Sequence, residues 1–268
     1  MLDLVILTYN EEHRLPSALE VAKKWANDIF IVDKGSTDAT LEIAKSYGCK
    51  VISIPFSKQG HENTAEINLE IKKLKNTDNP WFLGLTPGEV PTKGFIDIAK
   101  SLATPESTHD VILVPVRIHS FGRFMPGGPW SFSSQPRLIN LNTAMVKNLC
   151  HDSYCITERS IQITDSEDSH IFHPTHVNFD SFIRSHVDYA LAETNNQTLD
   201  MVGSFVQQAE QYNFGFVMHS GADMRQFLAW KVYNYMVALK RLDDLQLPET
   251  EKYYLDMRNK YKKSEWQI

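Results

Sequence analysis

Two short polar segments have residue types that suit the binding of a nucleotide. Residues 8–12 have the sequence TYNEE, and residues 33–40 have the sequence DKGSTDAT. The ring of Tyr9 can stack on a nucleobase, and the carboxylates of Glu11 and Asp33 can accept hydrogen bonds from a base edge or a ribose. We therefore predict that the two segments together hold a nucleotide.

The second segment also has a purely structural interpretation. Gly35 allows a close backbone turn, and the Ser, Thr and Asp at residues 36–38 are typical of a helix start. In that interpretation Asp38 only caps a helix and Asp33 only ends a strand. The presence of both motifs in one chain favours the binding interpretation.

An alternation of strand and helix patterns surrounds these segments. The predicted strands are residues 2–7, 29–33, 51–54, 81–85 and 111–118. Helices lie between them, with Pro16 in the first turn of the first helix and Gly48 at the end of the second. The helix positions predicted to be buried are Leu15, Leu19, Ala22, Leu41, Ala44, Tyr47, Ile67, Ile71, Leu74, Phe95, Ile98 and Leu102.

Strands that are separated by single helices imply right-handed crossovers and a mostly parallel sheet with helices on both faces. Such sheets bind ligands at the carboxyl ends of their strands, which here precede residues 8–12, 33–38 and 86–89. Glycines, prolines and aromatics predict an ordered loop over residues 121–134, and the pattern becomes helical after about residue 178.

The two motifs together resemble the signature of family 2 glycosyltransferases, in which T-Y-N-E follows one strand and D-x-G-S-T-D-x-T follows the next. Further matches are FGR at 121–123, GGPW at 127–130, QPRL at 135–138 and CHD at 150–152. Their order resembles the subgroup that includes lipopolysaccharide core β-1,4-glucosyltransferases. The resemblance implies the α/β fold called GT-A, with a mostly parallel central sheet flanked by helices. It further implies a nucleotide-sugar-binding and catalytic domain over residues 1–178, with a helical extension over residues 179–268 packed on it.

The resemblance also implies roles for single residues. Asp152 would be the general base that deprotonates the acceptor hydroxyl, and the alternative is an aspartate that only forms a turn. Gly127, Gly128 and Trp130 would form a lid or acceptor wall, and the alternative for Trp130 is a place in the core. The implied donor-binding residues are Thr8, Tyr9, Asn10, Glu11, Asp33, Ser36, Asp38 and Arg137.

The chain departs from the family where a metal ion is expected. Family members read D-A-D-E there, and residues 86–89 of this chain read TPGE, so that Glu89 is the one carboxylate. Ser133 also replaces an expected acid. One carboxylate is a poor site for Mg²⁺ or Mn²⁺ unless other oxygens or waters complete the coordination.

Three explanations of this departure stay open. The enzyme can be metal-independent, with a basic side chain that neutralises the leaving phosphate. The candidates for that side chain are Arg123, Arg137 and Lys58. A Mg²⁺ or Mn²⁺ ion can instead be held by Glu89 together with His151 or His173. Or the protein has lost catalysis and retains nucleotide-sugar binding.

Composition limits the location and the partners. The formal net charge of −6 over 268 residues gives no sign of a general nucleic-acid-binding surface. Three cysteines without zinc spacing fit a reducing compartment, and no apolar run approaches the ~20 residues of a membrane span. With no signal-peptide pattern at its start, we expect a cytoplasmic protein, free or peripherally attached to the inner face of the membrane.

The expected function is inverting transfer of a sugar from a nucleoside diphosphate, with uridine as the expected base, to a hydroxyl acceptor in bacterial surface glycan synthesis. The partners are then the nucleotide-sugar donor and a glycan or other hydroxyl acceptor, with a modified base in phage DNA as an alternative. The alternative from another class is an inactive nucleotide-sugar-binding or scaffold protein. A dinucleotide-binding dehydrogenase is disfavoured because no G-x-G-x-x-G follows the first strand.

Overall fold

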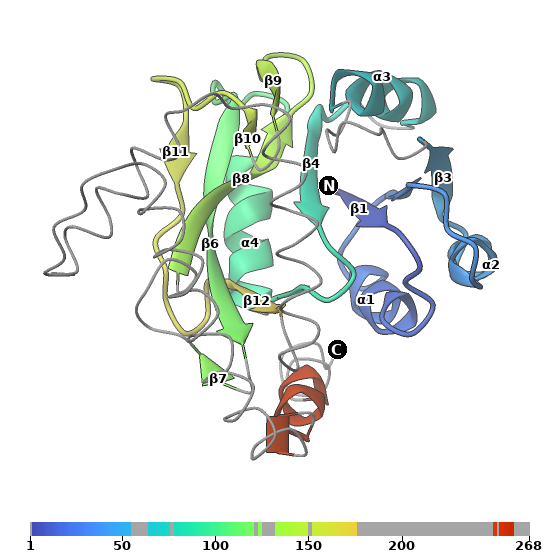
Figure 1. Cartoon of the computed structure of the whole chain (residues 1–268). Coiled ribbons are helices and arrows are strands. Elements are labelled where there is room, and N and C mark those ends of the chain that lie inside the picture. Colours follow the sequence, from blue (N-terminus) through green and yellow to red (C-terminus); the bar gives the residue numbers. More distant parts are fainter. Residues whose placement is uncertain are drawn as a thin grey trace, which may run out of the picture.

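The chain is built around one large mixed sheet, shown in Figure 1. This computed structural model describes residues 2–54, 64–75, 78–120, 123–124, 132–149, 152–175, 249–250 and 252–259. Within these residues the main path of the sheet has the order β3-β2-β1-β4-β8-β6-β12-β5, and β7 and β11 pair with β6. A separate two-stranded ladder joins β9 and β10.

The first half of the sheet is parallel. Its strands are β1 (Asp3–Thr8), β2 (Ile29–Asp33), β3 (Lys50–Ser53) and β4 (Trp81–Leu85). Thr8 is opposite Asp33 across β1 and β2, and Ile6 is opposite Leu85 across β1 and β4. The carboxyl ends of these strands, and the polar segments that follow them, therefore meet at one edge of the sheet.

The second half of the sheet is mixed. Its strands, with the small ladder, are β5 (Val90–Pro91), β6 (Val111–Ser120), β7 (Arg123–Phe124), β8 (Phe132–Asn140), β9 (Val146–Leu149), β10 (Asp152–Tyr154), β11 (Ile161–Gln162) and β12 (Ile171–Pro174). Strand β8 lies antiparallel between β4 and β6, so that the parallel order is interrupted there. The predicted loop over residues 121–134 is therefore wrong at both β7 and the start of β8, where the backbone pairs with β6.

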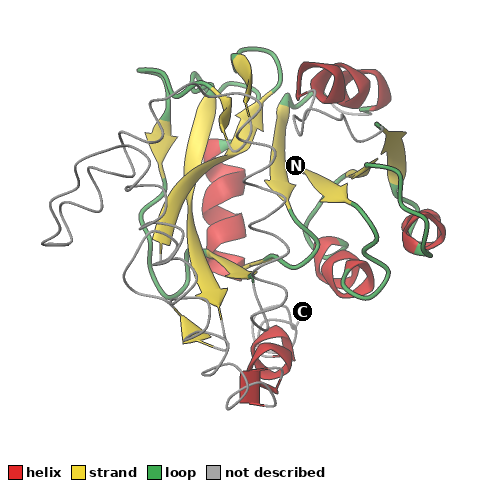
Figure 2. Ribbon diagram, viewed as in Figure 1, coloured by secondary structure: helices red, strands yellow, loops and turns green. Residues whose placement is uncertain are grey.

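Helices cover both faces of the sheet, as Figures 1 and 2 show. They are α1 (Leu15–Ala22), α2 (Thr40–Ser46), α3 (Thr64–Leu74) and α4 (Lys93–Leu102). One core cluster contains residues of α1, α2 and α4, and the other contains residues of α3 with Tyr154 of β10. The predicted α/β class with a mostly parallel sheet flanked by helices is thus confirmed, and it is consistent with the GT-A fold.

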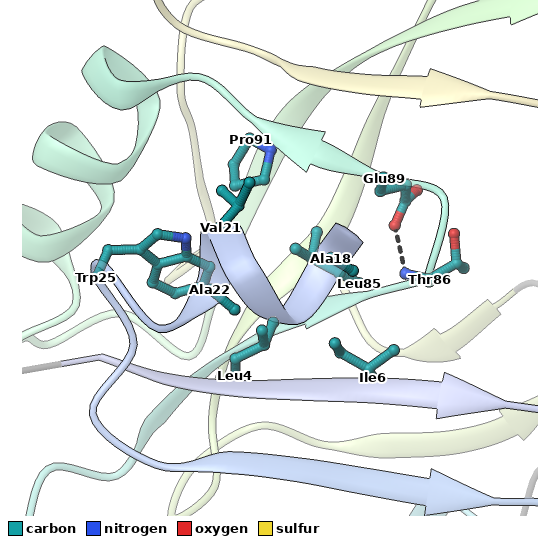
Figure 3. Close-up of a pocket in the computed structure, with 10 residues that line it drawn as sticks. All are labelled: Leu4, Ile6, Ala18, Val21, Ala22, Trp25, Leu85, Thr86, Glu89 and Pro91. Carbon is teal, nitrogen blue, oxygen red and sulfur yellow. Dashed lines mark hydrogen bonds between the residues drawn. The ribbon is translucent and has the colours of Figure 1, made fainter. Parts of the chain in front are cut away.

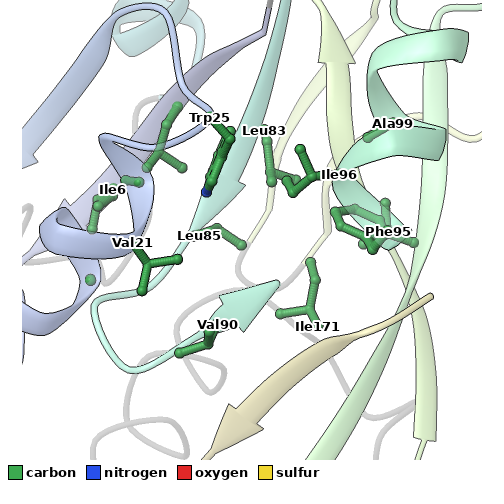
Figure 4. Packing of buried hydrophobic residues seen from close by; sticks show 14 of the residues in the cluster. Ile6, Val21, Trp25, Leu83, Leu85, Val90, Phe95, Ile96, Ala99 and Ile171 are labelled. Carbon is green, nitrogen blue, oxygen red and sulfur yellow. The ribbon is translucent and has the colours of Figure 1, made fainter. Parts of the chain in front are cut away.

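Two helix residues that were predicted to be buried are exposed. Figure 4 shows Phe95, Ile96 and Ala99 of α4 against the sheet. Ile98 instead points outward and is 37% exposed, because the buried stripe of α4 runs along Phe95, Ile96 and Ala99. Leu74, at the last position of α3, is 38% exposed, and the last buried residue of that helix is Ile71.

A helical segment at residues 252–259 packs near the carboxyl end of β6, far along the chain from it (Figure 1). Tyr254 is buried, and its hydroxyl donates to the carbonyl oxygen of His119 at 2.7 Å. The hydroxyl of Tyr253 lies 2.6 Å from Nδ1 of His119. Burial lowers the pKa of His119 to about 4, helped by His170 and other nearby cationic groups, so that its ring is neutral when it meets Tyr253.

The described helices include none that is long and apolar enough to cross a membrane. The predicted boundary between a domain of residues 1–178 and an extension of residues 179–268 falls outside the described residues and stays a prediction.

Candidate donor-binding site

The loops after β1 and β2 are joined by reciprocal hydrogen bonds. The amide of Asn10 donates to Oγ of Ser36 at 2.9 Å, and the amide of Thr37 donates to Oδ1 of Asn10 at 2.8 Å. Asn10 has a φ of 55°, in the left-handed region that asparagine tolerates better than most residues. The backbone and side chain of Asn10 therefore hold the two predicted nucleotide-binding segments together as one unit.

Asp33 is the buried centre of this unit, with 1% of its surface exposed. Its Oδ1 accepts from Oγ1 of Thr8 at 3.2 Å and from Oγ of Ser36 at 2.5 Å. Its Oδ2 accepts from the amides of Gly35 at 2.9 Å and Ser36 at 3.0 Å. These four bonds fill the lone-pair sites of a carboxylate. Asp33 therefore shapes the loop, while its negative charge has no cationic partner among the described residues.

Asp38 links the same two loops further from the sheet. Its carboxylate accepts from the amide of Glu12 at 3.1 Å and from the amide and hydroxyl of Thr40 at 3.0 and 2.5 Å. Partial burial raises the pKa of Asp38, but these hydrogen bonds outweigh that effect and hold the pKa below its ordinary value. The cap position of α2 is Ala39, one residue after the predicted Asp38, although the Asp38 carboxylate accepts from the amide of Thr40, the first residue of that helix.

Tyr9 and Glu11 have different surroundings in the first loop. The side chain of Tyr9 is 50% exposed, so its ring has an open surface on which a base can stack. The carboxylate of Glu11 is bound by Arg14, with Nε donating to Oε2 at 2.7 Å and Nη2 to Oε1. Tyr9 is thus the more accessible of the two predicted donor-binding side chains.

Residues 86–89 form a tight turn after β4 that is closed by Glu89. The amide of Glu89 donates to the carbonyl oxygen of Thr86 at 3.0 Å, and the amide of Thr86 donates to Oε2 of Glu89 at 2.6 Å (Figure 3). A cavity of about 10 Å³, with room for about one water molecule, lies beside this turn against α1. The glutamate side chain therefore folds back into the protein.

Glu89 is also held by two basic side chains. Its Oε1 accepts from Nη2 of Arg137 at 3.0 Å and lies 2.8 Å from Nδ1 of His173, a close contact without hydrogen-bond alignment. Burial raises the pKa of Glu89, but Arg137, His173 and the Thr86 amide more than reverse this and bring it to about 2. Glu89 is therefore a buried, neutralised carboxylate, and Arg137 is engaged with it.

A divalent cation does not fit these residues as they are arranged. Both oxygens of Glu89 have partners, and the described part of the chain has no group of three His, Cys, Asp or Glu side chains placed to hold a metal ion. A Mg²⁺ or Mn²⁺ ion at Glu89 and His173 would have to displace Arg137. Hard cations prefer several free oxygen ligands, which this turn does not offer.

Several predicted site residues lie outside the described part of the chain. The backbone of Asp152 lies in β10, in a strand and not a turn, but its side chain is not described. The residues with no described side chain are Lys58, Arg123, Gly127, Gly128, Trp130, Ser133, His151 and Asp152. Their roles in the acceptor site and in catalysis stay predictions.

The sequence reasoning missed Arg14, which binds Glu11. Arg14 lies two residues after the first motif, and its spacing from Glu11 is the i,i+3 spacing of an ion pair, which was a usable signal.

Comparison with known proteins gives a family-model match to the segment that contains the first two loops. Residues 3–65 match the model of the family described as Glycosyl transferase family 2. This match runs from β1 through β3 and includes both joined loops.

Two curated relatives have similar segments. Over 51 residues the chain is 43% identical to "Uncharacterized glycosyltransferase RT0209" of Rickettsia typhi, covering 19% of this chain and 18% of the relative. Over 93 residues it is 32% identical to an uncharacterized glycosyltransferase of Rickettsia bellii, covering 34% and 29%. The chain thus matches less than a third of the length of either relative.

Solved structures with a similar arrangement include S. aureus TarS 1-349 in complex with UDP, with a TM-score of 0.49 and 16% identity over 97% of this chain and 91% of that one. Another is glucosyl-3-phosphoglycerate synthase from Mycobacterium tuberculosis in complex with Mn²⁺, UDP and glucosyl-3-phosphoglycerate. Its TM-score is 0.32, with 14% identity over 45% of this chain and 44% of that one.

Proposed function

We propose that this protein is a glycosyltransferase that moves a sugar from a nucleoside diphosphate, with uridine as the base to test first, to a hydroxyl acceptor. The observation that carries the proposal is the joined pair of loops at the carboxyl edge of the sheet. Asn10 and Asp33 fix these loops, and the ring of Tyr9 stands half-exposed beside them. The same stretch of chain is the part that matches the family model.

Each part of the loop pair has a role in holding the donor. The ring of Tyr9 stacks on the base, and the uncompensated negative charge around Asp33 favours the donor N–H and O–H groups of a base or ribose. Because Asp33 is already fully hydrogen-bonded, its direct partners are the loop residues, and it acts on the donor through the loop shape that it fixes.

The chemical step is an inverting displacement. The carboxylate of Asp152 takes the proton of the acceptor hydroxyl, and the acceptor oxygen attacks the anomeric carbon from the face opposite the leaving group. The bond between the anomeric carbon and the β-phosphate oxygen breaks, and the nucleoside diphosphate departs with that electron pair. The acceptor proposed from the resemblance is a bacterial surface glycan such as lipopolysaccharide core, with a peripheral place at the membrane.

A binding panel tests the donor site. UDP, GDP, CDP, ADP and their sugars are compared by thermal shift and calorimetry, with Mn²⁺ and with EDTA. We expect a nucleotide-specific rise in melting temperature that EDTA leaves unchanged. A rise that requires Mn²⁺ would restore the metal alternative, and the absence of any binding would refute the donor site.

A second candidate is a nucleotide-sugar-binding protein without catalysis. It is favoured by the closed turn at residues 86–89, where Glu89 is neutralised by Arg137 instead of facing a metal ion. Incubation of the protein with a bound nucleotide sugar and a panel of glycan acceptors separates the two candidates. Release of the nucleoside diphosphate that depends on acceptor supports the transferase, and binding without release under every condition supports the second candidate.

A further inference from the structure

Two arginines from opposite ends of the chain come together beside the turn at residues 86–89. Arg14 precedes α1, and a Cβ atom added to Gly88 would lie 3.4 Å from its Nη1. Arg258 belongs to the helical segment at residues 252–259, which Tyr254 fixes to the carbonyl oxygen of His119. Arg258 lies one helical turn after Tyr254 and so shares its face of the helix, against His119 and the neighbouring strand residue Pro174. The carbonyl oxygen of Pro174 would lie 3.6 Å from the same added Cβ atom at Gly88, so this face of the helix and Arg14 approach one turn of the chain.

Arg258 differs from the other arginines whose side chains the structure describes. The other four each have a carboxylate partner: Arg14 has Glu11, Arg117 has Asp165, Arg137 has Glu89 and Arg159 has Asp110. For Arg258 the described residues supply no carboxylate, and its electrostatic neighbours are Arg14 and Tyr254.

This arrangement costs free energy while no anion is bound. Burial, and then the like charge of Arg14, lower the pKa of Arg258, but a guanidinium group stays charged in proteins. A partly buried cation beside another cation is stabilised by an anion that contacts both. A diphosphate is an anion of this kind, because guanidinium groups bind phosphate oxygens through paired hydrogen bonds.

The position of the pair suits the donor. Arg14 is three residues after Glu11 in the first nucleotide-binding loop, and the turn at residues 86–89 follows β4, the strand next to β1. The pair therefore lies at the same carboxyl edge of the sheet as Asn10 and Asp33. Arg14 and Arg137 each already have a carboxylate partner, Glu11 and Glu89, so Arg258 supplies the cation without such a partner among the described residues near this turn.

We propose that Arg258, supported by Arg14, binds the diphosphate of the nucleotide donor and neutralises the leaving group where other enzymes of this chemistry use a divalent cation. This inference rests on the proposed function and assigns the charge-neutralising role to residues that the sequence reasoning did not consider. It also makes the C-terminal helical segment a part of the donor site.

The test compares Arg258→Gln and Arg258→Lys with Lys252→Ala, a control on the exposed side of the same helix. The full chain is titrated in EDTA with UDP, with uridine, which lacks phosphates, and with inorganic pyrophosphate. We expect Arg258→Gln to weaken UDP binding roughly ten- to hundredfold and to abolish pyrophosphate binding, with uridine binding unchanged. Arg258→Lys retains the charge and should lose less UDP affinity than Arg258→Gln. Lys252→Ala should bind all three probes like the wild type.

The melting temperature of the unliganded Arg258→Gln variant separates the proposed role from a structural one, because the two roles predict different changes in it. Removal of the unpaired charge is expected to leave it unchanged or higher. A lower melting temperature together with equal losses for UDP and uridine would assign Arg258 a structural role and overturn the inference. Unchanged UDP affinity in Arg258→Gln would overturn it while the proposed function stands, whereas a wild type that binds none of the three probes would refute the proposed function itself.

Discussion

Asp33, at the end of β2, and Glu89, in the turn after β4, lie at the same edge of the sheet. Both are buried carboxylates whose oxygens all have contacts. They differ in the charge of their partners. Asp33 accepts from two amides and two hydroxyls, all of them neutral. Glu89 accepts from one amide and faces Arg137 and His173. Hydrogen bonding alone thus does not distinguish the two buried acids, because among the described residues only Glu89 has a cationic partner.

The largest expected effect is on stability and concerns Glu89. Glu89→Gln removes the counter-charge of Arg137 while it retains the side-chain shape, and breaking a buried pair in this way costs about 3–5 kcal/mol. Urea denaturation measures the change. Glu167→Gln is the matched control, because that side chain is 86% exposed in its contact with Arg117. A loss below about 1 kcal/mol would mean that the two residues are not held as described.

The second effect is a pH dependence that belongs to Glu89. Its pKa is about 2 in the folded protein against an ordinary value of 4.5. The stabilisation that this difference provides is therefore fully present above pH 4.5 and is lost as the pH falls toward 2. The difference in unfolding free energy between wild type and Glu89→Gln should shrink by at most about 3 kcal/mol across that window. A constant difference from pH 6 to pH 3 would argue against the ion pair.

The third effect concerns Asp33, whose described hydrogen-bond partners are all neutral. Asp33→Asn replaces one carboxylate oxygen with an NH2 group, which cannot accept the hydrogen bonds that the surrounding N–H and O–H groups donate. We therefore expect a loss of roughly 2 kcal/mol in the free energy of unfolding. In contrast to Glu89→Gln, no buried cation is left without a partner, so the loss should be the smaller of the two. If Asp33→Asn costs more than Glu89→Gln in the same denaturation series, the distinction by partner charge fails.

The smallest effect on stability is expected for Tyr9→Ala, since half of that side chain is exposed. The free energy of unfolding should change by about 0.5 kcal/mol or less, while stacking loss weakens nucleotide binding by about 1–3 kcal/mol. Calorimetry with UDP measures the affinity, and Tyr9→Phe, which retains the ring, should bind like the wild type. Equal affinity in all three proteins would remove Tyr9 from the donor site.

The parallel half of the fold could be predicted from the sequence, and the contacts between distant residues could not. The strands at Ile29–Asp33 and Trp81–Leu85 were predicted with the observed bounds, because each is rich in large apolar side chains and gives way to a polar segment at its end. The insertion of β8 between β4 and β6 was not predicted, because pairing partners far apart in sequence leave no local pattern.

The candidate site divides in the same way. The two loops were predicted from their own residue types, and the structure brings Thr8, Asn10, Asp33 and Ser36 together. The state of Glu89 depends on Arg137, which is 48 residues away, and on His173. Its burial as a neutralised acid is therefore a property of the tertiary structure, which the TPGE sequence alone does not contain.

The docking of Tyr253 and Tyr254 onto His119 has a consequence for how the protein is made. The ribosome synthesises these tyrosines 134 and 135 residues after the histidine that they contact. The sheet can therefore assemble during translation before the helical segment at residues 252–259 docks onto His119, since domains fold as their segments emerge. A nascent chain that stalls before residue 249 would carry the paired loops around Asn10 without Arg258, so this cation would join the sheet only after the loops have been made.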